Sequence, residues 1–389
     1  MMSLVTFANL GRKKNLKTAD VLPVIKVFED RGALEQVVCL INDDFEFEGT
    51  VQAVPAVMRY LIKIIEKIRG VSSRETLERT FDWFAARKLK KTNIVLFHAG
   101  NTMPKTFRVA KRFGAICVDL AVAAHDNTNA RIEQEELTQL GFPGSSGFYQ
   151  TQAARTAHVS DFDDLIALSE FARESYIENG FPEAHVSVAA LDVDLNKFVP
   201  SQVERKETFT VLYVAHTQPL KGLHYLLDAW KTLSLPNAKL QIVGGFSSSM
   251  PEALRKRYEA AIASDASIEW VPGVADPVPY YQQASVFAFP SLTEGFGRVT
   301  LEAMACGLPV VTTENAKGIV EDGKTGFIVP IRDAGALAEK IRYLYEHQDT
   351  AQTMGREARR AVERKKPFGE AVYEIYATIL ARHNHEKHD

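Results

Sequence analysis

The sequence predicts an α/β fold made of two doubly wound, Rossmann-like domains, and three observations support this prediction. Short runs rich in β-branched residues alternate with helical patterns along the chain, which favours βαβ units and parallel sheets. With 389 residues, the chain exceeds the size at which one hydrophobic core usually stops growing. A polar stretch at residues 192–207, with Pro200 and few residues that could anchor a core, divides the expected strands into two series. We therefore expect two domains joined by this linker.

The expected strands follow from these apolar, β-branched runs. The first series comprises residues 4–7, 36–41, 94–98, 115–122 and 164–168, and the second comprises residues 209–215, 239–243, 268–271, 285–289 and 308–312. In the second series, three strands end at loops rich in Gly, Pro or polar residues. Because ligands of doubly wound folds lie at the carboxyl ends of the strands, these loops should line one crevice. A last amphipathic helix is expected from Phe368 to about Arg382.

Composition and termini indicate a cytoplasmic protein. Apolar residues make up 46% and charged residues 24%, which is typical of soluble globular proteins, and a net charge of -3 gives no reason to expect nucleic-acid binding. The cysteines Cys39, Cys117 and Cys306 lie in apolar stretches without metal-type spacing, so we interpret them as buried reduced thiols. We see neither a signal peptide nor a run near the roughly 20 apolar residues of a transmembrane helix.

Residues 290–312 carry the strongest functional signal. Gly295 and Gly297 would let the backbone pass close to a ligand, and a helix that starts just after them should end at Gly307. The N–H groups at the start of such a helix favour an anion such as a pyrophosphate. Glu294 and Glu302 could accept hydrogen bonds from paired hydroxyls of a polyol. Two glutamates eight residues apart also occur by chance as solvated charges, but here they belong to one coherent loop–helix–strand unit.

This stretch resembles the family 4 retaining glycosyltransferases (glycosyl transferases group 1), whose signature is P-S-x-x-E-G-x-G-x-x-x-x-E-A-x-A-x-G-x-P-V-V. Nearly all of residues 208–345 match, including the Lys221–Gly222 loop. The resemblance implies a GT-B fold, with two Rossmann-like domains facing a central cleft. It implies an acceptor-side domain at 1–192, a nucleotide-sugar-binding domain at 205–366, and a helix at 367–389 that packs back toward the first domain.

The resemblance also implies roles for individual residues. Glu294 would contact the transferring sugar, Glu302 would hold the ribose hydroxyls, and Lys221 would neutralise the donor diphosphate. The implied catalytic residues are Glu294, His125 and Lys221. The implied donor-binding residues are His216, Lys221, Gly244, Gly273, Glu294, Gly295, Phe296, Gly297 and Glu302. His216 stands where relatives usually have an arginine, so its phosphate contact would depend on pH, and a purely structural role is equally open.

The N-terminal half gives weaker signals. Gly11 and the three cations after it could cradle an anion or form a solvated loop. His98 and His125 end two expected strands, where a histidine more often has only a packing role. The resemblance favours a functional role for His125, because a histidine at this point in relatives lies against the transferring sugar. Asp192 and Asp194 imitate a D-x-D metal motif, but relatives read Gly-Val-Asp there, so we expect no metal.

Residues 54–112 are strongly basic, with fourteen Lys or Arg against four acids. Their first part, residues 54–69, has the pattern of an amphipathic helix. We favour a core helix with a solvated basic face. The alternative is that this helix contacts an anionic membrane surface, with the protein attached peripherally to the inner face of the membrane. The glycine-rich residues 141–150 could be an acceptor-side loop or a plain surface connection.

Taken with the resemblance, the sequence predicts an enzyme that moves a hexose-type sugar from a nucleotide diphosphate sugar to a glycan or lipid-linked acceptor. Retention at the anomeric carbon is implied, with no metal and no cofactor beyond the donor itself. Two alternatives remain: a sugar-phosphate synthase or phosphorylase on the same fold, and a non-catalytic scaffold that binds nucleotide sugars.

Overall fold

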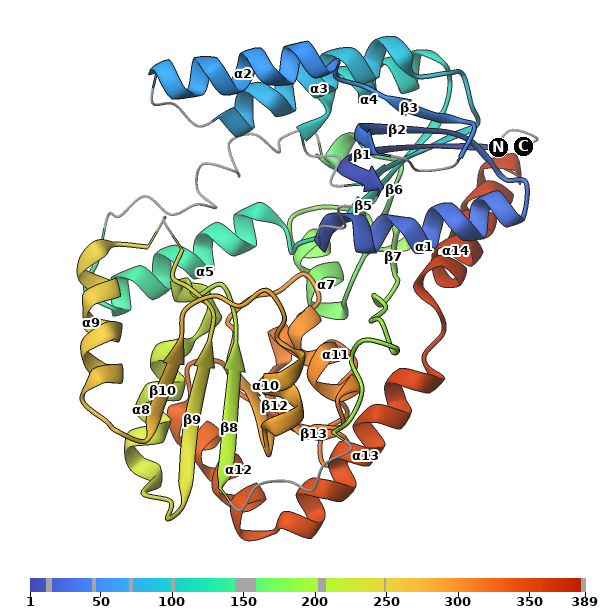
Figure 1. Cartoon of the computed structure of the whole chain (residues 1–389). Helices are drawn as coiled ribbons and strands as arrows, with labels where there is room; N and C mark the ends of the chain where they lie inside the picture. Colours follow the sequence, from blue (N-terminus) through green and yellow to red (C-terminus); the bar gives the residue numbers. More distant parts are fainter. Residues whose placement is uncertain are drawn as a thin grey trace. The chain divides into compact units, whose positions relative to one another are not determined.

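The computed structural model describes residues 1–11, 16–43, 47–69, 73–98, 102–143, 159–201, 208–247 and 250–385. The chain forms two compact units (Figure 1). Unit 1 contains Met1–Ala123, Gln152–Leu191 and Lys366–Asp389, and unit 2 contains Ala124–Thr151 and Asp192–Lys365. The expected first domain ran to residue 192, whereas the contacts group residues 124–151 with unit 2.

Unit 1 is built on a seven-stranded parallel sheet of order β3-β2-β1-β4-β5-β6-β7. Its strands are β1 (Met2–Gly11), β2 (Leu34–Asp43), β3 (Thr50–Gln52), β4 (Ile94–His98), β5 (Ile116–Ala121), β6 (Asp164–Ala167) and β7 (Val186–Val188). Its helices are α1 (Leu16–Asp30), α2 (Ala56–Arg69), α3 (Ser73–Lys88), α4 (Pro104–Arg112), α7 (Glu170–Glu178) and α14 (Phe368–His385), with short 3-10 turns at Val159–Asp161 and Glu183–His185.

The C-terminal helix α14 belongs to unit 1, where it packs against α1 (Figure 1). The Phe28 ring contacts the rings of Tyr373 and Tyr376 edge-on, with centroids 5.1 and 5.0 Å apart. Val372 and Ile379 are buried against the apolar residues of β1, β4, β5 and β6. The helix expected at 368–382 therefore covers one face of this sheet.

Unit 2 holds a six-stranded parallel sheet of order β10-β9-β8-β11-β12-β13. Its strands are β8 (Phe209–Val214), β9 (Ala238–Val243), β10 (Ile268–Val271), β11 (Val286–Phe289), β12 (Val310–Thr313) and β13 (Gly326–Val329). Its helices are α5 (Asp126–Gln139), α8 (Leu223–Leu233), α9 (Glu252–Ala263), α10 (Val278–Gln283), α11 (Arg298–Ala305), α12 (Ala334–Glu346) and α13 (Gln348–Arg364), with 3-10 turns η4 (Pro219–Lys221) and η5 (Glu314–Ala316).

The strand order of unit 2 places its ligand-binding edge. From β8 the chain runs outward through β9 and β10, then crosses back to β11 on the other side of β8. The two loops that leave the carboxyl ends of β8 and β11 therefore diverge at the switch point of the sheet, where doubly wound folds bind ligands. Lys221 and Glu294 lie in these two loops.

The predicted fold class is confirmed, and all ten expected strands are present. β1 extends to Gly11, four residues beyond its expected end, and the short strands β3, β7 and β13 were not expected. Both sheets are parallel throughout, as the alternation of strand and helix patterns indicated.

The favoured interpretation of the basic helix at 54–69 is wrong. This segment forms α2, but five of the six large apolar side chains that the structure describes in this helix are exposed rather than in the core. Val57, Tyr60 and Leu61 are 69, 67 and 45% exposed, while Ile62 is buried. No helix in the described ranges is long and apolar enough to cross a membrane.

Candidate active site

The loops after β8 and β11 bring the first pair of expected site residues together. The Lys221 Nζ forms an ion pair with the Glu294 Oε1, and the two side chains are only 19 and 14% exposed. The Ser291 hydroxyl lies 3.0 Å from the same carboxylate oxygen. The Leu292 N–H donates to the Leu220 carbonyl at 2.8 Å, so backbone bonds also join the two loops. A cation and an anion thus meet at the switch point, partly shielded from water.

A glycine allows this close approach of the two loops. Gly222 has a φ of +68°, and a Cβ at this position would lie 2.0 Å from the Pro290 carbonyl oxygen. No other residue type fits that space without moving the backbone. The Tyr213 hydroxyl, buried under the loop, donates to the Lys221 carbonyl at 3.2 Å. The position of Lys221 is therefore set by its backbone as well as by its ion pair.

The loop from Glu294 continues through Gly295, Phe296 and Gly297 into α11. Gly297 has a φ of +82° at the N-cap, and the buried Phe296 ring anchors the loop. A Cβ on Gly297 would lie 2.8 Å from the Ala316 carbonyl oxygen, so another segment also passes close to this turn. The N–H groups at the start of a helix can bind an anion, although the Thr300 N–H of this turn donates to the Gly297 carbonyl at 2.9 Å.

Glu302 lies in the second turn of α11 and is 9% exposed. The Tyr281 hydroxyl donates to its Oε2 at 2.9 Å. Burial raises the pKa of Glu302, although the Tyr281 hydrogen bond and the charges of Arg298 and Lys197 oppose this effect. The carboxylate is therefore incompletely solvated, and a ligand hydroxyl that donated to it would relieve part of that cost.

Three further expected donor-binding residues lie at the ends of neighbouring strands. His216 follows β8 and is exposed. Gly244 follows β9 with a φ of +124°, and a Cβ there would lie 1.9 Å from the Ala215 carbonyl oxygen. Gly273 follows β10 with a φ of +73° and open space around it. All three belong to the same edge of the unit 2 sheet as Lys221 and Glu294.

His125 caps the N-terminus of α5, which packs against η4, the turn that contains Lys221. Its Nδ1 accepts a hydrogen bond from the Asn127 N–H at 3.2 Å. An accepting Nδ1 places the ring proton of the neutral imidazole on Nε2. Burial lowers the pKa of His125 and so favours this neutral form. The other strand-end histidine, His98, is buried in unit 1, where its Nδ1 lies 3.0 Å from the Thr6 hydroxyl.

A buried network around Glu136 was not predicted from the sequence. The Glu136 carboxylate is fully buried and accepts from His224 Nε2 at 2.6 Å, Tyr225 Oη at 2.9 Å and Arg332 Nε at 2.9 Å. Burial raises the pKa of Glu136, but these hydrogen bonds outweigh it and the pKa is lowered overall. The partners lie far from Glu136 in the sequence, so no local pattern could reveal the network.

The two aspartates of the D-x-D pattern have other partners. Asp192 Oδ1 lies 2.6 Å from Lys365 Nζ, and Asp194 Oδ1 accepts from two N–H groups of its own turn. Among the described side chains, no three of the types His, Cys, Asp and Glu gather as a metal site would require. Residues 12–15 of the Gly11 loop and residues 144–150 of the glycine-rich loop lie outside the described residues.

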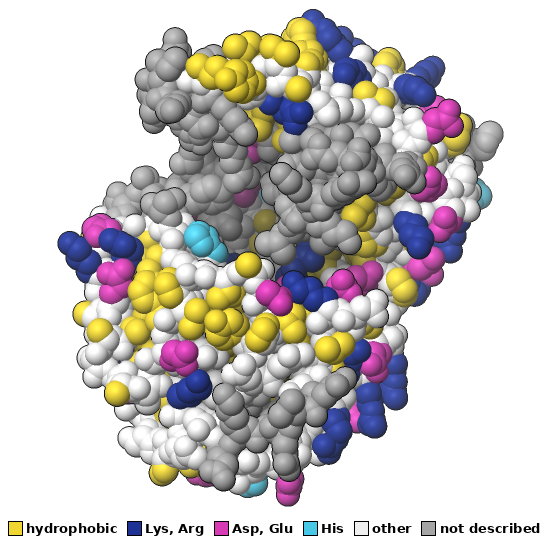
Figure 2. Space-filling model, in the orientation of Figure 1, with side chains coloured by type: hydrophobic (Ala, Val, Ile, Leu, Met, Phe, Trp, Pro, Cys, Tyr) yellow, Lys and Arg dark blue, Asp and Glu magenta, His cyan; other side chains and the backbone are white. Residues whose placement is uncertain are grey.

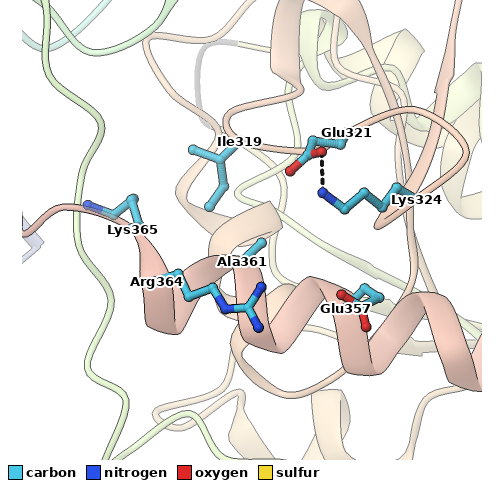
Figure 3. A pocket seen from close by; sticks show the side chains of 7 residues that line it. All are labelled: Ile319, Glu321, Lys324, Glu357, Ala361, Arg364 and Lys365. Carbon is cyan, nitrogen blue, oxygen red and sulfur yellow. Dashed lines mark hydrogen bonds and ion pairs between the residues drawn. The ribbon is translucent and has the colours of Figure 1, made fainter.

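A charged groove of about 260 Å³ lies between the loop before β13 and the end of α13 (Figure 3). It is lined by Ile319, Glu321, Lys324, Glu357, Ala361, Arg364 and Lys365. The Lys324 ammonium pairs with Glu321 at 2.7 Å, and the Glu357 carboxylate pairs with Arg360 at 2.5 Å. None of the expected site residues lines this groove.

Two known glycosyltransferases are similar to this chain in sequence. The chain is 30% identical over 238 residues to the capsular polysaccharide biosynthesis glycosyltransferase CapM of Staphylococcus aureus, which covers 56% of this chain and 62% of CapM. It is 33% identical over 187 residues to a D-inositol 3-phosphate glycosyltransferase of Paenarthrobacter aurescens (strain TC1), covering 44 and 46% of the two chains. The chain thus spans about half to three-fifths of the length of these relatives.

Solved structures resemble the chain over nearly its whole length. Sucrose-phosphate synthase from Thermosynechococcus elongatus matches 98% of this chain and 99% of its own, with a TM-score of 0.70 at 19% identity. Anabaena Alr3699/HepE in complex with UDP-glucose matches 98 and 99%, with a TM-score of 0.65 at 17% identity. WaaG, a glycosyltransferase involved in lipopolysaccharide biosynthesis, matches 96 and 99%, with a TM-score of 0.65 at 15% identity. At these identities the similarity shows the fold, which is GT-B.

Residues 196–361 match the family described as Glycosyl transferases group 1. This segment contains both loops of the switch point and all of α11. Over residues 196–361 the chain is therefore similar to the glycosyl transferases group 1 family, and its fold is GT-B.

Proposed function

We propose that the protein is a retaining glycosyltransferase that moves a hexose-type sugar from a nucleotide diphosphate sugar to a glycan or lipid-linked acceptor. The observation that carries the proposal is the Lys221–Glu294 pair at the switch point of a group 1 domain. Unit 1 would supply the acceptor side. The solved neighbour HepE, which was crystallised with UDP-glucose, supports a nucleotide sugar as the donor class.

The reaction breaks the bond between the anomeric carbon and the donor diphosphate and forms a bond to an acceptor oxygen on the same face. The Lys221 ammonium and the N–H groups of α11 would stabilise the negative charge that develops on the departing diphosphate. Glu294, released from Lys221 as the diphosphate takes its place, would accept hydrogen bonds from the sugar hydroxyls. A phosphate oxygen would take the proton that the acceptor loses. Neither a metal nor a resident cofactor has a step in this scheme.

The donor class is tested by thermal unfolding of the full chain with UDP-, GDP-, ADP- and dTDP-sugars, because a ligand that binds only the folded state raises its apparent stability. We expect one donor to stabilise the wild type, and the Lys221→Met variant to lose most of that stabilisation. Lys239→Met is the control, because Lys239 forms a more exposed ion pair with Glu269 elsewhere in unit 2. Stabilisation that survived in Lys221→Met would contradict the proposed site.

The reaction is tested by release of nucleoside diphosphate and transfer of labelled sugar. Full turnover of Glu294→Ala with the identified donor would contradict the role of Glu294. Inorganic phosphate or a sugar phosphate that outcompetes glycan acceptors would favour the synthase or phosphorylase alternative. Donor binding without release of nucleoside diphosphate and without sugar transfer to glycan, phosphate or sugar-phosphate acceptors would favour the non-catalytic scaffold.

We also propose that α2 and its surroundings contact an anionic membrane surface, where a lipid-linked acceptor would lie. Five large apolar side chains of α2 are exposed, namely Val57, Met58, Tyr60, Leu61 and Ile64. Figure 2 shows hydrophobic side chains gathered in the region of α2, with Lys and Arg side chains beside them. This combination of an exposed apolar helix face and basic surroundings is typical of helices that lie in the membrane interface.

Charge supports this surface. Within residues 54–112, the exposed charged side chains that the structure describes are all basic: Arg79, Arg87, Lys88, Lys90, Lys91, Lys105, Arg108, Lys111 and Arg112. The two described acids of this range, Glu78 and Asp82, are buried, and Asp82 accepts from the Thr106 N–H at 2.8 Å at the start of α4. Among the side chains that the structure describes in this range, the exposed charge is therefore basic, although Lys90 and Lys111 pair with Glu35 and Asp163 and the whole chain carries a net charge of -3.

Sedimentation with vesicles tests this contact. We expect binding to vesicles that contain phosphatidylglycerol, weak binding to pure phosphatidylcholine, and loss of binding at high salt. Tyr60→Asp should abolish binding, whereas Tyr343→Asp, which changes an exposed tyrosine of unit 2, should leave it intact. Equal binding of both variants, or binding insensitive to salt and lipid charge, would contradict the proposal.

A further inference from the structure

The side chain of Asn129 joins the start of α5 to the loop that carries Glu294. Its Oδ1 accepts from the Thr293 hydroxyl at 2.5 Å, and its Nδ2 donates to the Ala124 carbonyl at 2.8 Å. Ala124 immediately precedes His125, and Thr293 immediately precedes Glu294. One amide group therefore links the residues that precede two proposed site residues.

The direction of these two hydrogen bonds is fixed by chemistry. A backbone carbonyl can only accept, so the Nδ2 of Asn129 must face Ala124. The Oδ1 then faces Thr293, whose hydroxyl must act as the donor. Asn129 and Thr293 are 2 and 4% exposed, so water does not replace either bond. A valine at 293 would keep the shape of the side chain and leave the amide oxygen without its donor.

Several contacts hold the rest of α5 to the other elements of unit 2, among them the ion pair of Glu135 with Arg332 at 3.1 Å. The helix packs against η4, and its last turn is fixed by the hydrogen bonds of the buried Glu136. At the other end, the His125 ring is oriented by the N–H that its Nδ1 accepts. The placement of the His125 ring therefore follows the first turn of α5, and the Asn129–Thr293 bond joins that turn directly to the Glu294 loop.

We infer that Asn129 and Thr293 are positioning residues that hold His125 at a set distance from Glu294, so that both side chains meet the same sugar. This inference rests on the proposed function and adds to it the residue pair that aligns the two groups. Loss of the hydrogen bond lets the first turn of α5 shift against the loop. A misplacement on the order of 1 Å lowers turnover by about 100-fold. Donor affinity, which we assign to Lys221 and Glu302, should change little.

The test uses the full chain and measures release of nucleoside diphosphate as glucose passes to a glycan acceptor or to water. The donor is UDP-, GDP-, ADP- or dTDP-glucose, whichever the wild type turns over fastest. We expect Thr293→Val to lower kcat by roughly 10- to 100-fold while the donor KM stays within about threefold. Thr293→Ser keeps the donating hydroxyl and should restore kcat to within about threefold of wild type. Thr312→Val is the control, because Thr312 is also a buried threonine of unit 2 whose hydroxyl donates to a backbone carbonyl, at 2.9 Å.

Hydrogen exchange supplies a second readout that does not depend on turnover. Thr293→Val should speed amide exchange in the first turns of α5, and Thr293→Ser should not. Wild-type kcat in Thr293→Val, an equal loss in Thr293→Ser, or a raised KM with unchanged kcat would each overturn the positioning role. If the wild type and Thr312→Val release no product with any donor, the proposed function fails instead. The exchange data then still decide whether Thr293 holds α5.

Discussion

Replacement of Glu302 by glutamine should raise the stability of the ligand-free protein and weaken donor binding. Glu302 is 9% exposed as a whole residue, and one described hydrogen bond, from Tyr281, reaches its carboxylate. Because burial raises the pKa of Glu302, its ionised form costs stability at every pH above that pKa, and the cost fades as the pH falls below it. Glutamine removes the charge and keeps an oxygen that can accept from Tyr281.

The size of the effect follows from the partners of Glu302. A buried polar group with incomplete hydrogen bonding costs about 1–3 kcal/mol, and the Tyr281 bond offsets part of this. We expect Glu302→Gln to gain about 1–2 kcal/mol, or roughly 2–6 °C in apparent Tm. Ribose hydroxyls would lose a charged acceptor worth about 1.5–3 kcal/mol, so Kd for the donor should rise roughly 10- to 100-fold.

Differential scanning calorimetry at neutral pH, with and without donor, measures both effects. Glu269→Gln is the control, because Glu269 is 49% exposed and should gain no stability when its charge is removed. The reasoning would be refuted if Glu302→Gln melted lower than wild type without ligand and yet bound the donor with equal affinity.

Three other predictions concern the backbone and two titrating groups. Gly222→Ala should destabilise the protein by more than about 2 kcal/mol in urea unfolding, because the added Cβ would meet the Pro290 carbonyl. At Gly323 the φ is +72° but the space is open, so Gly323→Ala should cost about 1 kcal/mol. Equal costs for the two variants would contradict the steric argument. The pKa of Glu136 is lowered, so its contribution to stability is complete above its ordinary pKa of 4.5 and is lost as the pH falls through the folded pKa. In a plot of unfolding free energy against pH, Glu136→Gln should therefore flatten the decline at acid pH. His125 has a lowered pKa, so the acid limb of kcat/KM that it controls should lie below its ordinary value of 6.5, and a limb above that value would point to another group.

The parallel sheets could be predicted from the sequence because their strands are buried on both faces. Strands such as Ile94–His98 and Val286–Phe289 read as continuous apolar runs, which stand out against the helical patterns between them. Thr50–Gln52 and Val186–Val188, with three residues each, are too short to carry a periodic signal.

Contacts between distant segments could not be predicted in this way. Asn129 and Thr293 are 164 residues apart, and each alone reads as an ordinary polar residue of a helix or a loop. The pairing of Lys221 with Glu294 follows from the strand order, which brings the ends of β8 and β11 together. In α2, the apolar pattern predicts two faces but does not say whether another element covers the apolar one; the exposed Val57 and Tyr60 answer that question.

Calorimetric titration of nucleotides tests the central claim, that Lys221 binds the diphosphate of a donor; Lys221 lies in the segment that matches the glycosyl transferases group 1 family. The titration compares uridine, guanosine, adenosine and thymidine diphosphates with their monophosphates, in the wild type and in Lys221→Met. A charge-assisted contact to the second phosphate is worth about 1.5–3 kcal/mol, so one diphosphate should bind the wild type at least about tenfold more tightly than its monophosphate. We expect Lys221→Met to lose that preference. Failure of every diphosphate to bind, or a preference that persists in Lys221→Met, would contradict the assignment.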